Sequence, residues 1–224
     1  MKYIILIPTY NPDERLLEIL KQINNKYDVI IVDDGSINKD IFKKCEQFAH
    51  VISYEENKGK GYALKTGFKY IKENYKKYVV VTMDDDKQHK LEDAINLCDY
   101  VKDHEEELAI GRRHWDKTTP ITSRIGNAFA RKAFKRHTGL NIYDTQNGLR
   151  AFSNKLMDYM LNIEGNRYEY EMNVLYNLKN NNIKYKEIDI ETIYIDNNKT
   201  SKFRVFKDSF KILKDMRKWK KNNN

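Results

Sequence analysis

Three consecutive carboxylates, Asp84, Asp85 and Asp86, are the strongest candidates for chemistry in this sequence. Adjacent carboxylates repel one another, so such a run is costly unless a cation lies among them. If the segment is extended, Asp84, Asp86 and Gln88 point the same way, because side chains alternate along a strand. Two carboxylates and one amide oxygen suit Mg²⁺ or Mn²⁺, with positions left over for phosphate oxygens. The competing interpretation is a solvated acidic turn ahead of a helix that begins near Leu91.

Two more polar segments follow strand-like runs, and a glycine-bearing segment precedes a helix. Residues 8–11 follow the first apolar run and residues 33–36 follow the second, as residues 84–89 follow the fourth. In an open parallel sheet, ligands bind beyond the carboxyl ends of the strands, so the three segments are expected to share one crevice. Glycines within residues 57–61 would let the backbone approach a phosphate at the helix N-terminus, although a simple turn explains them equally well.

Apolar periodicity predicts elements that alternate between strand and helix over the first half of the chain. Strands are expected at residues 3–7, 28–32, 51–54, 78–83 and 107–110. Helices are expected at residues 13–24, 41–48, 61–74, 91–101, 121–137 and 168–180, and one or two strands within 184–195. Short strands separated by helices predict an α/β fold with a mostly parallel, Rossmann-like sheet and helices on both faces. Because no repeat or linker is apparent, we expect one catalytic domain, 1–200, followed by a tail, 201–224.

The charge distribution narrows the classes of partner. The formal net charge is +8, and residues 201–224 hold nine Lys or Arg against two Asp, so the first 200 residues are near neutral. That near neutrality argues against nucleic-acid binding. Cys45 and Cys98 lack a His or Cys at ligand spacing, so both are expected as reduced thiols in a cytoplasmic protein. No apolar run approaches the roughly 20 residues of a membrane-spanning helix.

The tail has the pattern of an amphipathic helix. Its apolar residues recur at steps of three and four, and lysines occupy much of the remaining surface. The apolar set is Phe203, Phe206, Phe210, Leu213 and Met216. This pattern is typical of a helix that lies in a membrane interface with its lysines on anionic head groups. The alternative is a helix that docks on the protein's own core.

Eight segments, in order through nearly the whole chain, carry a family resemblance. They are PTYNPDE at 8–14, VDDGS at 32–36, NKGKGYAL at 57–64, DDDKQH at 84–89, GRR at 111–113, DTQNGLRAF at 144–152, YEYEM at 168–172 and ETIYIDNNKTSKF at 191–203. With these segments the sequence resembles the family 2 glycosyltransferases, which have the GT-A fold. More narrowly, it resembles the dolichyl- or polyprenyl-phosphate sugar transferases.

The resemblance implies a role for each matching residue. The nucleotide-sugar is expected to contact Pro8, Tyr10, Asp33, Asp34, Lys60, Asp84, Asp85, Lys202 and Arg204. The metal, Mg²⁺ or Mn²⁺, is expected on Asp84, Asp86 and Gln88, and the acceptor phosphate on Arg113, Arg124 and Arg131. The catalytic set is expected to be Asp86, Arg113, Arg124, Asp144 and Glu171, with Asn147 and Gly148 in the acceptor-side loop.

The implied reaction is an inverting transfer from a UDP- or GDP-sugar to a polyprenyl phosphate, on the cytoplasmic face of the membrane. A phosphate monoester has its second pKa near 6, so this nucleophile is already charged and needs no general base. A glycan hydroxyl acceptor would need one, and Asp144 or Glu171 would then be the candidates. A nucleotide-sugar-binding module without turnover is the other alternative. The expected partners are the donor, the lipid phosphate and the membrane surface, with a separate membrane protein or a second copy as further candidates.

Overall fold

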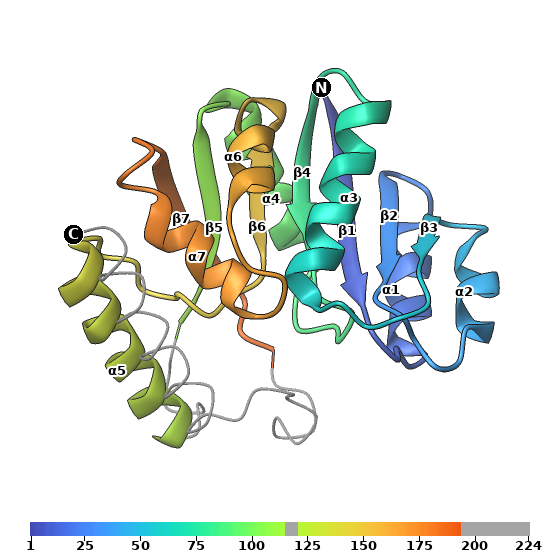
Figure 1. Ribbon diagram of the computed structural model, residues 1–224, viewed down its shortest axis with the longest axis horizontal. Helices are drawn as coiled ribbons and strands as arrows, with labels where there is room; N and C mark the ends of the chain where they lie inside the picture. Colours follow the sequence, from blue (N-terminus) through green and yellow to red (C-terminus); the bar gives the residue numbers. More distant parts are fainter. Residues whose placement is uncertain (115–120, 194–224) are drawn as a thin grey trace.

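The protein is built on a seven-stranded sheet with strand order β3-β2-β1-β4-β6-β5-β7 (Figure 1). The computed structural model describes residues 1–114 and 121–193, except the side chains of residues 121–126 and 129. The strands are β1 (Lys2–Thr9), β2 (Asp28–Asp33), β3 (His50–Ser53), β4 (Tyr78–Thr82), β5 (Glu107–Arg113), β6 (Arg150–Ser153) and β7 (Lys184–Ile190). Only β6 runs antiparallel, to both β4 and β5, whereas the other described pairings are parallel.

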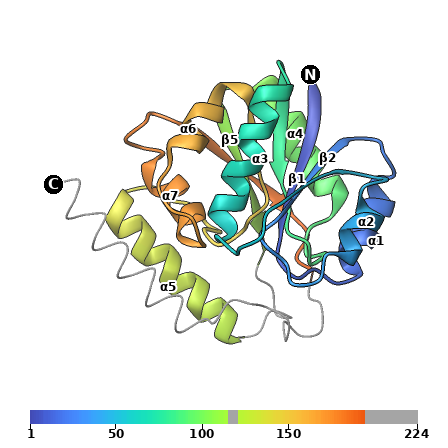
Figure 2. The same cartoon turned by 45° about the vertical axis from the view of Figure 1, so that its right-hand side comes forward.

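Helices cover both faces of the sheet. They are α1 (Arg15–Ile23), α2 (Asp40–Cys45), α3 (Lys60–Asn74), α4 (Leu91–Asp103), α5 (Ile121–Thr138), α6 (Met157–Asn162) and α7 (Glu169–Asn177), with a 3₁₀ turn η1 (Asn154–Leu156). Figure 1 shows α3, α6 and α7 in front of the sheet and α4 and α1 behind it. In Figure 2 helix α5 stands at the side of the molecule next to α7.

The two sides of the central strands bury two separate apolar cores. On β1, Ile4 and Leu6 face the core beneath α3, whereas Ile5 and Ile7 face the core beneath α1 and α4. All four side chains are fully buried, which explains why the strand reads as a continuous apolar run rather than an alternating one. At roughly 25 cal/mol per Å² of buried apolar surface, such strands supply much of the stability that holds the polar loops at their ends.

The predicted α/β fold with a mostly parallel sheet is confirmed, and the elements that were not predicted, β6, η1 and α6, all lie in the second half of the chain. Residues 150–153, for which no strand was predicted, form β6 between β4 and β5. Its sequence, Arg-Ala-Phe-Ser, lacks the adjacent β-branched residues, Val and Ile, that indicate the equally short β3. Residues 184–195 were expected to hold one or two strands, and the described part holds one, β7.

Three further expectations concern cysteines, membrane spans and the tail. Cys45 and Cys98 are both buried and free. Among the described helices, none combines the length and apolar character needed to cross a bilayer. The amphipathic helix expected within 201–224 lies outside the described residues, as does the boundary near residue 200.

Candidate active site

The polar loops that follow β1, β2 and β4 meet at one edge of the sheet. The Asp34 amide donates to the carbonyl of Thr9, 2.8 Å away, which joins the second loop to the first. The Thr9 hydroxyl donates to the carboxylate of Asp85, which joins the first loop to the third. Parallel neighbours place these carboxyl ends side by side, as the sequence predicted.

Asn11, for which the sequence predicted no separate role, joins the first loop to the second. Asn11 has a left-handed backbone, with φ of 48°, a conformation that Asn tolerates better than most residues. Its amide donates to the Ser36 hydroxyl at 2.8 Å, and its side-chain oxygen accepts from the Ile37 amide at 2.9 Å. Pro8 is a buried part of β1, and Tyr10 is exposed just beyond it. Tyr10 is therefore the aromatic residue that this loop presents at the surface.

Asp33 and Asp34 have different environments although both are buried. One oxygen of Asp33 accepts from the Ser36 amide at 2.8 Å, and its Oδ2 has no hydrogen-bond partner among the described residues. The Asp34 oxygens accept from the Tyr54 hydroxyl and from the side chain of Asn57, and also from the amides of residues 58 and 59. Asp34 thus fixes the 57–59 segment, whereas Asp33 keeps acceptor capacity at a buried position, where an unpaired oxygen is costly.

The glycine at the start of α3 is required by a close approach of two backbones. Gly59 has φ of 103°, and a Cβ there would lie 2.5 Å from the carbonyl oxygen of Asn166 and 2.5 Å from Cγ of Arg167. Only glycine fits this position without strain. The tight turn delivers Lys60, the first residue of α3, into the middle of the site.

Lys60 forms ion pairs with two carboxylates from different elements. Its Nζ lies 2.7 Å from Oδ1 of Asp84 and 3.1 Å from Oε1 of Glu171, which is on α7. Burial opposes the charge of Lys60, but the two carboxylates outweigh it and raise the pKa of the ammonium. Burial also works against the charge of Asp84, yet the Lys60 ammonium outweighs it and lowers the pKa of Asp84 to about 2.

The acidic run forms a turn, so the expectation of an extended segment is wrong. Residues 85 and 86 form the turn and Lys87 has φ of 64°. Lys87 is turned outward and pairs with Glu18 of α1 at 2.5 Å. The three aspartates consequently take separate partners: Asp84 contacts Lys60, Asp85 contacts Thr9, and Asp86 accepts from the backbone amide of Gln88 at 3.0 Å. The argument from strand alternation for Asp84, Asp86 and Gln88 therefore does not apply to this turn.

His89 links the acidic run to the loop of residues 144–148, where an acceptor was expected, a contact that the sequence did not predict. Its Nδ1 accepts from the Asp84 amide at 3.3 Å, and its Nε2 lies 2.9 Å from Oδ1 of Asn147. Asn147 accepts from the Leu149 amide through the same oxygen and donates from Nδ2 to the carbonyl of Gly111, which fixes its amide orientation. The Nε2 of His89 must therefore carry the proton. The Gln-His pair after the acids was the available signal.

Two of the three arginines expected to bind the acceptor phosphate have described side chains, and each contacts another residue of the chain. Arg113 holds the fully buried Asp144 in a two-pronged ion pair, with its Nε at 2.7 Å from Oδ2 and its Nη2 at 3.1 Å from Oδ1. The guanidinium of Arg131 lies over the ring of Tyr143, 4.6 Å from its centre. Arg124 belongs to α5, but its side chain is outside the described part, as are Lys202 and Arg204.

The oxygen atoms around Asp84 fit a divalent cation whose remaining ligands come from a substrate. Among the described residues, no three His, Cys, Asp or Glu side chains gather where they could hold a metal ion. Mg²⁺, however, is commonly bound by one or two carboxylates together with substrate phosphates. A Cβ at Gly148 would lie 3.0 Å from Oδ2 of Asp84, 3.0 Å from Oε1 of Glu171 and 3.1 Å from Nζ of Lys60. The small glycine thus leaves a polar space bounded by two carboxylates.

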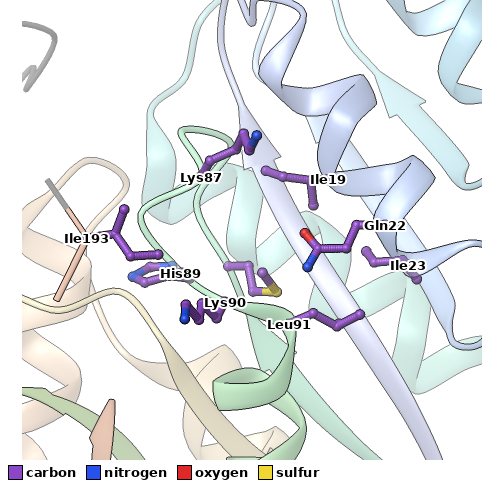
Figure 3. Close-up of a pocket in the computed structure, with 9 residues that line it drawn as sticks. Ile19, Gln22, Ile23, Lys87, His89, Lys90, Leu91 and Ile193 are labelled. Atoms are coloured by element: carbon purple, nitrogen blue, oxygen red, sulfur yellow. The ribbon is translucent and has the colours of Figure 1, made fainter. Parts of the chain in front are cut away.

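A small cavity of about 100 Å³ lies behind the acidic run rather than within the site (Figure 3). It is bounded by α1, the segment 87–90, the start of α4 and Ile193. Its volume is below the roughly 300–1,000 Å³ of ordinary ligand sites. The segment at its mouth is tied down, because Lys90 pairs with Glu191 and the Glu191 amide donates to Asp93 at 3.1 Å. The cavity therefore belongs to the packing of residues 191–193 against the loop.

The sequence is similar to known proteins over most of its length. The model of the family described as Glycosyl transferase family 2 matches residues 4–164. An uncharacterized protein of Methanocaldococcus jannaschii is 31% identical, over 93% of this chain and 90% of its own length. The UDP-N-acetylglucosamine–dolichyl-phosphate N-acetylglucosaminyltransferase of Methanococcus voltae is 29% identical and is matched over 86% of each chain.

The fold is also similar to that of a solved structure with a bound nucleotide and metal. Glucosyl-3-phosphoglycerate synthase from Mycobacterium tuberculosis, in complex with Mn²⁺, uridine diphosphate and glucosyl-3-phosphoglycerate, gives a TM-score of 0.62. The match covers 89% of this chain and 75% of that one, at 15% identity. At that identity the similarity concerns the fold alone, and it confirms the GT-A-like architecture.

Proposed function

The chain belongs to glycosyl transferase family 2, and we propose that it transfers a sugar, with inversion, from a UDP- or GDP-sugar to a polyprenyl phosphate. The proposed lipid acceptor is supported by the similarity, over 86% of both chains, to an enzyme named for dolichyl phosphate. The proposed cofactor, Mg²⁺ or Mn²⁺, is supported by the Mn²⁺ in a structure of the same fold.

One observation carries the proposal: Asp84, Lys60 and Glu171 converge, from three separate elements, at the edge of the sheet where the loops after β1 and β2 also end. Charged side chains of both signs are thereby held partly buried in one place. One ammonium and two carboxylates leave a net negative charge, so the cluster is suited to a divalent cation, which would stabilise the charge that develops on a leaving diphosphate.

The nucleotide end of the donor is proposed to lie over the loops after β1 and β2. The Oδ2 of Asp33 is a buried acceptor without a partner in the described part of the chain, so a base N–H or a ribose hydroxyl would satisfy it. Pro8 and Tyr10 flank the same loop. Asp34 already accepts from four groups of residues 54–59, so we assign to it the positioning of that segment rather than contact with the nucleotide.

The diphosphate end is proposed to lie against Asp84 and Asp86. These two carboxylates, with Gln88 as a further ligand, would hold the metal, and a bound metal would supply Lewis-acid stabilisation of the leaving group. Asp85, which contacts Thr9, would support the turn rather than coordinate. We propose that Lys202 and Arg204, which lie outside the described residues, add positive charge to the diphosphate.

The acceptor phosphate is proposed to bind on the β5 side of the site. Asp144 aligns the guanidinium of Arg113, and the Arg131 guanidinium lies beside Tyr143, so both present oriented positive charge near this side. Arg124 is proposed to join them from α5. Guanidinium groups suit this role because their planar fork binds phosphate oxygens in pairs.

The environment of Asp144 favours a phosphate over a hydroxyl as the nucleophile. Its side chain is fully buried, and both of its oxygens bind Arg113. A carboxylate held in this way is poorly placed to take a proton from a substrate. Glu171 is likewise engaged, by Lys60. A phosphate monoester that is already mostly dianionic needs neither group as a base.

The test is direct transfer with the full chain. UDP- and GDP-sugars labelled in the sugar are incubated with Mn²⁺ and a short polyprenyl phosphate, and the lipid product is identified by mass spectrometry. We expect product with the lipid phosphate and none with the matching polyprenol. Transfer to a glycan alone would favour the hydroxyl alternative, and donor binding without transfer or hydrolysis would favour a non-catalytic module.

Membrane contact is proposed to come from the basic tail. Residues 201–224 carry most of the net charge, and each Lys or Arg near an anionic surface contributes about 1 kcal/mol to binding. We propose a peripheral position on the inner face of the membrane, alone, as an oligomer or beside a membrane protein. Anionic liposomes should sediment the full chain but not a chain ending at residue 200. Equal sedimentation of both would contradict this assignment.

A further inference from the structure

Lys60 supplies positive charge at the place where the proposed metal would act. Its ammonium is closer to Asp84, at 2.7 Å, than to Glu171, at 3.1 Å. The side chains of Lys60 and Glu171 are 18% and 17% exposed, and that of Asp84 is 31% exposed. At this degree of burial an ion pair is screened less than on the surface. Asp84 is therefore neutralised by the protein's own cation.

The three charged groups border the same small space. The position that a Cβ would take at Gly148 is 3.0 Å from Oδ2 of Asp84, 3.0 Å from Oε1 of Glu171 and 3.1 Å from Nζ of Lys60. A second cation on Asp84 would therefore stand close to the Lys60 ammonium, and like charges at this separation repel strongly. The ammonium and a divalent cation compete for one carboxylate.

We propose that Lys60 is a resident cation of the metal site, which leaves Asp84 when a divalent metal binds and is then held by Glu171. This inference rests on the proposed metal-dependent transfer. In the first state one ammonium is shared by two carboxylates. In the second state Asp84 would be a ligand of the metal, and Lys60 and Glu171 would form an ion pair with no net charge. Glu171 is thus a positioning residue that makes the departure of Lys60 less costly, and the freed ammonium stays near the diphosphate.

The exchange makes opposite predictions for the two partners. Replacing Lys60 by Met removes the competitor while keeping an unbranched chain of similar length, so Mn²⁺ should bind more tightly, by about tenfold or more. Replacing Glu171 by Gln removes the group that receives the ammonium, so Lys60 should stay on Asp84 and Mn²⁺ should bind more weakly. Mn²⁺ affinity is measured by titrating the full chain with MnCl₂ alone and following the electron paramagnetic resonance signal of free Mn²⁺.

A simple change of local charge would shift Mn²⁺ affinity in the same directions, so the Lys60→Met/Glu171→Gln double variant is needed to distinguish the two explanations. If Glu171 acts through Lys60, Glu171→Gln should have little effect in the Lys60→Met background. If Glu171 acts on the metal through space, the substitution should weaken binding equally in both backgrounds. Non-additivity of this kind is what a double-mutant cycle measures. Lys60→Gln serves as a second variant in case the methionine side chain perturbs folding.

Matched controls come from the other end of the same helix. Lys72 on α3 pairs with Asp158 on α6, away from the carboxyl ends of the strands. Lys72→Met and Asp158→Asn change the net charge by the same amounts as the test variants, and Mn²⁺ affinity should be unchanged in both. Equal affinity for Mn²⁺ in the parent and Lys60→Met proteins, including no binding by either, overturns the proposal, as does an additive cycle.

The titration contains neither nucleotide-sugar nor lipid, which separates it from the test of the proposed function. A non-additive cycle together with absent lipid transfer would reject the proposed transfer to a lipid phosphate and would leave the exchange of cations standing. Lipid transfer together with an additive cycle would reject only the exchange of cations.

Discussion

His89 can be divided into its two hydrogen bonds by two substitutions, and the consequences should differ. Its Nδ1 holds the backbone of Asp84, and its Nε2 holds Asn147. In His89→Asn the side-chain oxygen reaches the place of Nδ1, so the bond to Asp84 is kept. In His89→Gln the side-chain nitrogen reaches the place of Nε2, so the bond to Asn147 is kept. The pair therefore separates support of the acidic run from support of the acceptor-side loop.

The expected losses of stability follow from the geometry. The bond to Asp84 is long, at 3.3 Å, so its loss should cost about 1 kcal/mol, whereas the 2.9 Å bond to Asn147 is buried and its loss should cost about 1–1.5 kcal/mol. For a chain of this size, 1 kcal/mol corresponds to roughly 2–4 °C in Tm. The asparagine variant should thus be no more stable than the glutamine variant.

Activity should show the reverse order. The glutamine variant frees the backbone of Asp84, and a displacement of about 1 Å at a catalytic group can cost roughly 10²-fold in rate. We expect kcat/KM to fall about 10-fold or more in His89→Gln and to fall less in His89→Asn. Transfer assays at saturating Mn²⁺, with Tm measured on the same preparations, give the comparison. If activity followed Tm instead, His89 would be only a packing residue and the reasoning would fail.

The remaining predictions concern the donor loops and the metal. Asp33→Asn should weaken binding of uridine or guanosine diphosphate, measured by calorimetry, by about tenfold with little change in Tm, because only its Oδ2 lacks a partner among the described residues. Asp34→Asn should instead lower Tm, by several degrees, since several donors of residues 54–59 lose a charged acceptor; the reverse pattern would exchange the two roles. Gly59→Ala should destabilise the chain by more than 1 kcal/mol in urea unfolding, because its φ of 103° and the 2.5 Å approach to Asn166 both exclude a Cβ; a neutral result would contradict the tight turn. Removal of divalent metal with EDTA should abolish transfer, and Mn²⁺ should restore it; undiminished transfer in EDTA would reject the metal.

Much of the fold was predictable because the central strands are buried on both faces. The continuous apolar runs of β1 and β4 follow directly from that burial, and their ends located the acidic run and the Asp33–Asp34 pair. The expectation that three polar loops meet at one edge needed only the parallel order of the strands. Strand β6 was not predicted, because it has no β-branched residue and its neighbours β4 and β5 are distant in sequence.

The site was predictable in its residue types and less so in its pairings. Alternation assumed an extended acidic run, but the turn at residues 85–87 sends Lys87 outward to Glu18 and separates the three aspartates. Equally, the sequence treats Asp33 and Asp34 alike, and only the fold reveals that Asp34 is used to hold residues 57–59. Hydrogen bonds of this kind depend on elements that are brought together by folding, so no local pattern encodes them.

The acceptor-side loop reaches the metal-side residues by two independent routes, and this has a consequence for catalysis. Asn147 contacts His89, which holds the Asp84 backbone, and a Cβ at the neighbouring Gly148 would lie 3.0 Å from Oδ2 of Asp84. We therefore expect a movement of this loop to change the surroundings of the Asp84 backbone and side chain. The Asn147–His89 bond is the shorter link of the first route, at 2.9 Å, and the His89–Asp84 bond is the longer one, at 3.3 Å. If the acceptor binds at this loop as proposed, we expect its binding to change the position of Asp84, and a change of Mn²⁺ affinity on addition of the lipid phosphate would measure that coupling.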